Sequence, residues 1–217
     1  GGGGGGSQSD VNPNNGGSGG GGYIRTNGAG TNTKGLADNS GYNSTGTNGV
    51  SGVASNFATN DGYVLAGGGG GSSATAIEPR NTQSDPLGRT GSVGGAGTAW
   101  LDGTTYAGGG GGSIEQRYST QAVTGTGGSG GGGIGGVAKN YFGDTNLVNA
   151  TSGSTNTGSG GGGANYMAPI TGVRGNGGSG VVIIRYAGGT AASGGTITAT
   201  GGFTYHTFTS SGTFTPS

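Results

Sequence analysis

The stretch AGGGGGS at residues 107–113 decides how this chain folds, and the identical stretch recurs at residues 66–72. A run of five glycines is a poor α-helix, because each glycine costs about 1 kcal/mol relative to alanine. It is also a poor β-strand, because it has no side chains to pack on neighbouring strands. The remaining regular conformation is the extended three-fold helix, with about 3 residues per turn and a rise of roughly 3.1 Å per residue.

Such a helix makes no internal hydrogen bonds, so its N–H and C=O groups must find partners in other segments. Without Cβ atoms, several such helices can lie side by side at close approach. We therefore expect a mostly β and irregular fold without significant α-helix, in which a bundle of polyglycine II-type helices packs with short β-strands. The other glycine-dense segments that supply this bundle lie at residues 1–6, 16–22, 127–136, 158–163 and 175–180.

Glycine accounts for 64 of the 217 residues, about four times the ordinary share of roughly 7%. Collagen is excluded, because the chain has no Gly-X-Y period and only five prolines. Disorder fits badly, because the net charge is zero and the chain contains nine Tyr and five Phe. Zero net charge also removes the electrostatic basis for binding nucleic acid or anionic membranes. The chain has no cysteine and does not begin with methionine, and we expect a processed product or a piece of a longer polypeptide.

The sequence predicts two parts of the chain. Residues 1–180 form a glycine-rich scaffold whose connectors differ widely in length, and residues 181–217 form a C-terminal β segment. In that segment, residues 181–186 are typical of a buried strand, residues 196–200 and 203–209 of a hairpin around Gly201-Gly202, and residues 213–215 of a further short strand. Asn-Gly and Asp-Gly pairs indicate turns in the rest of the chain.

The stretch GGSGVVIIRY at residues 177–186 resembles the closing strand of glycine-rich domains in bacteriophage tail-fibre and related surface proteins. YHTFTSSGTFT at residues 205–215 resembles the β segment that opens such a domain, and YVLAGGGGG at residues 63–71 resembles the strand that leads into its first glycine run. The multiple runs also resemble the polyglycine sandwich of phage tail-tip adhesins. The long connectors resemble no known family.

This resemblance implies an extracellular or virion-surface protein in which loops between glycine helices contact the host. The opening-type segment lies at the C-terminus here, which indicates either one period of a tandem array or strand exchange between subunits. We therefore expect self-association, with a host surface glycan or outer-membrane protein as a further partner and no membrane insertion. The candidate assembly residues are Val181, Val182, Ile183, Ile184, Phe203, Tyr205, Phe208 and Phe214.

Catalytic and metal chemistry find little support in the sequence. The single histidine, His206, lies in an alternating strand pattern without a nucleophile motif, so we interpret it as structural. The acidic residues are scattered and cysteine is absent, which disfavours a metal site. GNGGSG at residues 175–180 matches G-x-G-x-x-G, but a β run follows it where a dinucleotide site needs a helix. We expect no enzyme activity and no cofactor.

Aromatic residues of the connectors are the best candidates for surface contacts, since such side chains commonly anchor glycan or protein partners. The alternative, which we favour for any single residue, is that they cover the flanks of the glycine bundle. Asn43 and Asn149 fit the N-glycosylation pattern. The candidate contact residues are Trp100, Tyr106, Tyr118, Tyr141, Phe142 and Tyr166.

Two functions remain open from the sequence. The first is a structural subunit of an extracellular or viral fibre that assembles through glycine-rich packing and terminal β segments. The second is a tail-fibre tip adhesin whose loops bind a host receptor. The displaced C-terminal segment favours the first, and the long irregular connectors favour the second.

Overall fold

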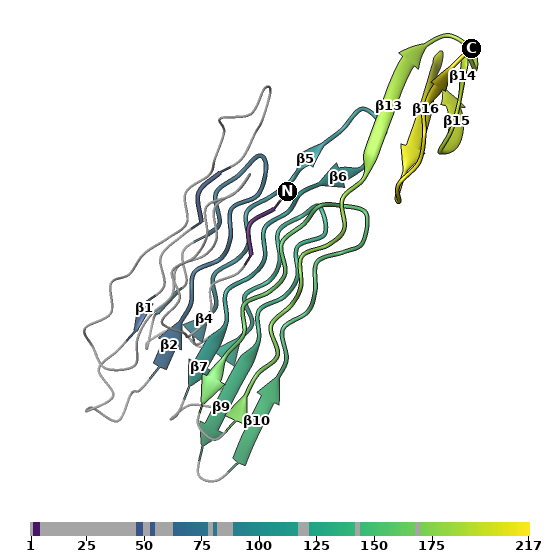
Figure 1. Ribbon diagram of the computed structural model, residues 1–217. Helices are drawn as coiled ribbons and strands as arrows, with labels where there is room; N and C mark the ends of the chain where they lie inside the picture. The colour runs from purple at the N-terminus through teal and green to yellow at the C-terminus, as the bar shows by residue number, and fades with distance from the viewer. Residues whose placement is uncertain are drawn as a thin grey trace.

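A computed structural model describes residues 2–4, 47–49, 53–54, 63–77, 80–81, 89–116, 122–141, 144–167 and 170–217. In these residues the protein is mostly β and irregular, and no helix occurs. Long extended segments run side by side between two ends of an elongated molecule (Figure 1). The coarse expectation of a β and irregular fold is thus confirmed.

One end of the molecule carries a five-stranded sheet in the order β1-β2-β7-β9-β10. The pairs are antiparallel except β7 with β9, which run parallel because both continue glycine segments of the same direction. Leu65, Ile114 and Val137 are buried neighbours on three adjacent strands and form the hydrophobic core of this end. The strands are β1 Val53–Ala54, β2 Tyr63–Leu65, β7 Ile114–Gln116, β9 Val137–Tyr141 and β10 Asp144–Val148.

Smaller sheets complete the bundle. β3 pairs antiparallel with β4, which pairs parallel with β8, and β11 pairs with β12. The hairpin β5–β6 lies at the other end of the molecule (Figure 1). These strands are β3 Arg80–Asn81, β4 Arg89–Thr90, β5 Thr98–Ala99, β6 Thr105–Tyr106, β8 Ala122–Val123, β11 Tyr166–Met167 and β12 Ile170–Thr171.

The C-terminal residues fold into a separate three-stranded antiparallel sheet in the order β13-β16-β15, beside the β5–β6 end. The predicted hairpin is confirmed: β15 pairs with β16, and Gly201 and Gly202 take the positive φ angles of 56° and 78° that a tight turn requires. The strands are β13 Val182–Ala187, β14 Ala192–Ser193, β15 Thr196–Thr200, β16 Phe203–Phe208 and β17 Thr215–Pro216.

Two expectations for this part need correction. The strand at residues 181–186 exists as β13, but it is not buried: Val182 is 60% exposed, because β13 is an edge strand. The last short strand lies at Thr215–Pro216 rather than at residues 213–215, since it pairs with β14.

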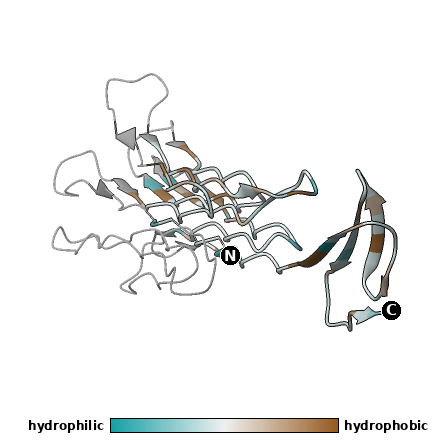
Figure 2. Cartoon of the chain, turned by 90° about the horizontal axis from the view of Figure 1, so that it is seen from above, coloured by the Kyte–Doolittle hydropathy of each residue, from teal (hydrophilic) through white to brown (hydrophobic). Residues whose placement is uncertain are grey.

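Between the two ends, glycine-rich segments lie both parallel and antiparallel to one another. In Figure 2 these segments are pale, because glycine lies near the middle of the hydropathy scale, and the brown stretches lie mainly in strands. The segments, named below by their residue numbers, are 2–4, 66–72, 91–97, 107–113, 124–129, 131–136, 150–154, 158–163 and 172–180.

The glycine segments differ from those predicted from the sequence in two respects. The run predicted at residues 127–136 is two antiparallel segments, because Gly130 and Gly131 (φ 94° and 95°) reverse the chain. Segments 91–97 and 150–154 were not recognised, because serine, valine, alanine and threonine interrupt their glycines. Both nevertheless exchange backbone hydrogen bonds with the recognised runs.

Candidate functional site

Segment 107–113 lies at the centre of the glycine array. It donates backbone hydrogen bonds to segments 2–4, 91–97 and 131–136, and it accepts them from segments 66–72, 124–129 and 158–163. These six neighbours are also bonded to one another in a closed ring, through Gly3 to Gly70, Gly95 to Gly69, Gly94 to Thr126, Gly135 to Gly125, Gly133 to Gly160 and Gly2 to Gly158. The central segment therefore has a complete hexagonal environment, in which donating and accepting faces alternate.

The register of these bonds advances by three residues. Gly111 and Ile114 donate to segment 131–136 and Gly108 donates to the adjoining Gly130, whereas Gly109 and Gly112 donate to segment 91–97. Each third residue thus faces the same neighbour.

Three parallel segments, 107–113, 131–136 and 158–163, bond to one another in a closed triangle. Each donates to the next in the same sense, at N···O distances of 2.9 to 3.0 Å. Followed from donor to acceptor, the bonds spiral along the triangle from Ile114 to Gly136, Gly163, Gly111, Gly133, Gly160 and Gly108. This spiral satisfies the backbone groups that the segments cannot satisfy internally.

Close approach explains why the interior positions are glycine. A Cβ atom built at Gly109 would meet the Gly69 carbonyl, and one at Gly112 would meet the Ala66 carbonyl, both closer than the 3.0 Å that real Cβ atoms respect. Ser92 is an exception to glycine at an interior position. It is fully buried, and its hydroxyl accepts from the Gly68 N–H (2.6 Å) and donates to the Ile77 carbonyl (2.5 Å).

Segments around the central one have their more exposed positions three residues apart. In segment 124–129, Gly125 and Gly128 are buried, while Thr126 and Ser129 are exposed. In segment 91–97, Val93 and Ala96 are the more exposed positions, again three apart. Spacing of non-glycine residues by three, as at Val93 and Ala96, would have indicated segment 91–97, whereas segment 150–154 carries no such signal.

Segment 172–180 lies at the edge of the array and leaves one face open. Its Gly175 and Gly178 donate to segment 158–163, and its Val173 and Asn176 N–H groups donate to the Asn149 and Ser152 side chains. The third face, formed by Arg174, Gly177 and Gly180, is exposed, and within the described residues its N–H groups have no partner. A Cβ at Gly177 or Gly180 would meet nothing closer than 3.4 Å.

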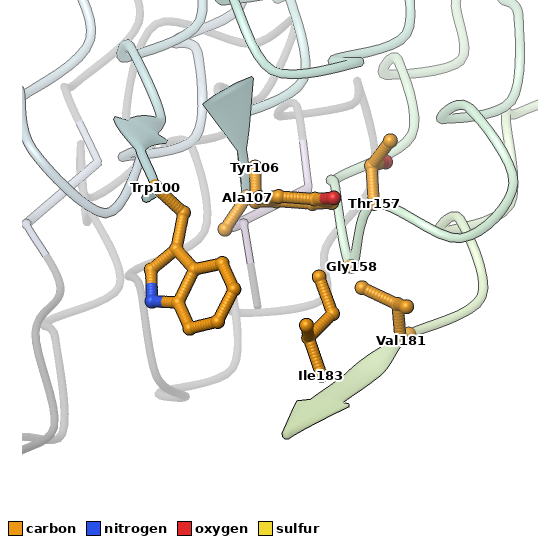
Figure 3. Close-up of a pocket in the computed structure, with 8 residues that line it drawn as sticks. Trp100, Tyr106, Ala107, Thr157, Gly158, Val181 and Ile183 are labelled. Atoms are coloured by element: carbon orange, nitrogen blue, oxygen red, sulfur yellow. The ribbon is translucent and has the colours of Figure 1, made fainter. Parts of the chain in front are cut away.

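A cleft of about 460 Å³ opens where this segment enters the C-terminal sheet. Trp100 and Tyr106 of the β5–β6 hairpin face Val181 and Ile183 across it (Figure 3). The structure thus gathers two predicted contact residues and two predicted assembly residues around one cavity. The remaining lining residues are Ala107, Thr157, Gly158 and Gly180.

The β5–β6 hairpin holds its aromatic residues through a compact turn. The Trp100 N–H donates to the Thr104 carbonyl (2.9 Å), and Asp102 accepts from the Thr104 N–H (2.9 Å) and from the Tyr106 hydroxyl (2.7 Å). Burial raises the pKa of Tyr106 above its usual 10.0, and the hydrogen bond to Asp102 raises it further. Ala107 follows with φ 60°, a left-handed conformation that costs an L-residue roughly 1–2 kcal/mol.

The C-terminal sheet contacts this hairpin through Tyr205. The Tyr205 ring meets Trp100 edge-on at 6.4 Å, and its hydroxyl donates to the Leu101 carbonyl (3.2 Å). On β13, the Arg185 Nε donates to the same hydroxyl (3.2 Å), and the guanidinium lies 3.3 Å from the centre of the Phe203 ring. These contacts hold β13, which carries Ile183, on the side of the cleft opposite the β5–β6 hairpin.

His206 is fully buried among aromatic residues. Its Nδ1 lies 2.7 Å from the Gly194 carbonyl, which can only accept, so Nδ1 carries the proton and Nε2 accepts from the Tyr186 hydroxyl at 2.9 Å. Phe214 meets the ring edge-on at 5.0 Å. Both nitrogens are occupied by structural partners, which leaves neither one for proton transfer to a substrate.

The G-x-G-x-x-G stretch lies in segment 172–180 and leads into β13, not into a helix. In the described part of the chain, no cluster of His, Cys, Asp or Glu residues could hold a metal ion. The same residues include no helix long and apolar enough to span a membrane.

The other predicted site residues are dispersed. Asn149 is exposed and its side chain accepts from the Val173 N–H (3.0 Å). Tyr141 ends β9 and Tyr166 begins β11. Ile184, Phe203, Phe208 and Phe214 are half-buried in or beside the C-terminal sheet, and Tyr205 is buried. Tyr118, Phe142 and Asn43 lie outside the described residues.

Comparison of the chain with protein-family models, curated proteins and solved structures finds no match.

Proposed function

We propose that this protein is a structural subunit of an extracellular or virion-surface fibre, built on a bundle of polyglycine II helices. The chain acts as a stiff rod and as a building block, not as an enzyme. Its glycine segments bond to one another through the backbone, and copies associate through the same kind of contact. The resemblance of its glycine runs and C-terminal segment to phage tail-fibre domains supports this assignment.

The hexagonal environment of segment 107–113 carries the proposal. Six bonded neighbours and a three-residue register are the packing that parallel and antiparallel polyglycine II helices adopt, whereas a β-strand bonds to only two neighbours. Ordering glycine costs more backbone entropy than ordering any other residue. In return, a chain in which glycine supplies 64 of 217 residues gains a rigid backbone lattice without a large hydrophobic core.

Fibre diffraction on aligned or dried protein tests the helix type. Polyglycine II gives an axial repeat near 3.1 Å per residue, whereas strands give about 3.3–3.4 Å and a spacing of about 4.7–4.9 Å between neighbours. A pattern with only the strand spacings would overturn the bundle.

The open face of segment 172–180 is the surface through which we expect copies to associate. Arg174 and Gly177 offer N–H groups three residues apart, and Gly177 carries no Cβ atom. Inside the array the same arrangement binds a neighbouring segment. The free edges of β13 and β15 offer a second backbone contact between copies, as edge strands do.

Gly177→Val tests this contact, because the added Cβ would meet only the Ser159 carbonyl, at an ordinary contact distance of 3.4 Å, and should leave the fold intact. We expect electron microscopy to show filaments or sheets of the unaltered chain and dispersed particles of the variant. Gly189→Val is the matched control, since Gly189 is also exposed with nothing within 4 Å and lies outside this face. Equal assembly of both variants would refute this face as the interface.

A tip adhesin remains the second candidate, favoured by one observation. β2, β7, β9 and β10 gather at the end of the array opposite β5–β6 (Figure 1), and the chain between several strands of that end belongs to the connectors. Connectors that join strands of the same end suit contact with a host glycan or outer-membrane protein. Immunogold labelling confined to the ends of native fibres would favour this function, whereas labelling along their length would favour the structural subunit.

A further inference from the structure

We propose that the cleft between the β5–β6 hairpin and β13 binds a pyranose unit of a glycan, with Trp100 as the stacking surface. This assignment goes beyond the fibre role and does not depend on it. The cleft's volume of about 460 Å³ falls within the roughly 300–1,000 Å³ of small-ligand sites.

The lining suits a ligand with one apolar face. Trp100, Tyr106, Val181 and Ile183 surround the cavity (Figure 3), and Trp100 is half-buried, so part of its ring remains open to a ligand. The C–H face of a pyranose packs on aromatic rings in this way, while its hydroxyls need polar partners at the edge.

Polar groups lie at that edge. The Tyr106 hydroxyl donates its proton to Asp102, which leaves its oxygen lone pairs free to accept. The exposed Asp102 carboxylate retains accepting capacity beyond its two bonds. The Gly180 N–H lines the cleft and has no partner among the described residues, so it supplies a donor.

The charge of the site selects between ligand classes. The Asp102 carboxylate repels phosphate, sulfate and carboxylate groups, and the cleft lining includes no cation. A purely apolar ligand would cover the Gly180 N–H without giving it a partner, and would leave the accepting capacity of the Tyr106 oxygen unused, which is costly. A neutral sugar satisfies both the apolar walls and these groups.

The site is also preorganised, because contacts within the protein hold its residues in place. The turn at Asp102, the Tyr205 hydroxyl bonded to Leu101, and the left-handed Ala107 hold the hairpin in one geometry. Backbone strain of this kind is found where a site is preorganised.

Trp100 is the only tryptophan of the chain, so its emission reports this cleft alone. The full chain is titrated with the methyl glycosides of glucose, galactose, mannose and N-acetylglucosamine, and emission is recorded. We expect a saturable change with at least one of them. Asp102→Asn should weaken that binding by about tenfold, through loss of a charged acceptor. The control Asp144→Asn makes the same change in β10, at the other end of the array.

The far-ultraviolet spectrum of each variant establishes that it is folded, and ligand-detected NMR with Tyr106→Phe gives a readout independent of the tryptophan. Loss of the Tyr106 oxygen should also weaken the binding that is measured by NMR. An unchanged emission with every glycoside would overturn the proposal. So would Asp102→Asn binding as tightly as Asp144→Asn, or a response to an apolar peptide alone.

Discussion

At the residue scale, the glycines of this protein differ sharply in what they do. Gly109 is surrounded by backbone atoms, and a methyl group there would overlap the Gly69 carbonyl. Gly189 is exposed with open space around it, and its φ lies outside the left-handed region. The same residue type is therefore indispensable at one position and replaceable at another, and only the neighbours distinguish the two.

Gly109→Ala should consequently destabilise the protein by about 3 kcal/mol or more, since the rigid backbone lattice cannot move aside as a side chain would. Gly189→Ala should change stability by less than about 0.5 kcal/mol. Denaturant unfolding followed by circular dichroism measures both. Similar midpoints for the two variants would contradict the packing around segment 107–113.

Tyr106 gives a prediction about pH. Its pKa is raised in the folded protein by burial and by Asp102, so its proton is held more tightly than in the unfolded chain. Any stability from this shift is present below the unfolded value of 10.0 and is lost as pH rises through the folded pKa.

Asp102→Asn should lower the Tyr106 pKa, because the carboxylate hydrogen bond and its charge both favour the neutral phenol. ¹³C NMR of the tyrosine ring, assigned through Tyr106→Phe, measures the titration. A higher pKa in the variant would contradict the geometry of the hairpin turn.

At the scale of the element, the exposed positions of segment 124–129 are three residues apart. In segment 124–129, Thr126 points outward and is exposed, whereas a Cβ at the next residue, Gly127, would meet the Gly132 carbonyl. Position within the three-residue turn, and not glycine content, decides where a side chain is accepted.

The double variant T126G/G127T tests this rule at constant composition, because it moves one side chain by a single residue. We expect it to lose several kcal/mol of stability, since the threonine then enters the array. Thr126→Gly alone should cost no more than about 1 kcal/mol, the entropic penalty of an added glycine. Thermal unfolding compares the two, and equal melting temperatures would argue against a fixed three-residue register.

At the scale of the whole molecule, the array and the C-terminal sheet are different kinds of structure. The array is held by backbone hydrogen bonds between segments, and the C-terminal sheet is held by β-pairing and by an aromatic cluster around His206. The two meet at the β5–β6 hairpin, where Tyr205 contacts Trp100 and Leu101.

Association between copies should depend little on salt. The formal net charge is zero, and the proposed interface consists largely of backbone groups, which salt screens weakly. Sedimentation at low salt and at about 1 M NaCl should give the same distribution of assemblies. Dissociation at high salt would point instead to an interface made by charged side chains such as Arg174.

The C-terminal hairpin, the burial of β13 and the cleft differ in how far the sequence predicts them. The C-terminal hairpin could be predicted, because alternating side chains around Gly201-Gly202 carry a strand and turn signal. The burial of β13 could not, since an apolar run such as residues 182–184 is the same in a central and an edge strand. The cleft could be predicted only in part. The sequence indicates Trp100 and Tyr106 as candidate contact residues, but it does not indicate that they face Val181 and Ile183 across a cavity.

The sequence by itself determined that, in the described residues, helices are absent and glycine runs form extended segments, and it determined where the C-terminal hairpin turns. These follow from local sterics and side-chain alternation, which are properties of a few adjacent residues. Only the tertiary structure decided which segment lies at the centre of the array, which face of segment 172–180 stays open, and which aromatic residues share a cleft. Glycine carries no side chain to specify a partner, so those choices depend on backbone hydrogen bonds between segments far apart in the chain.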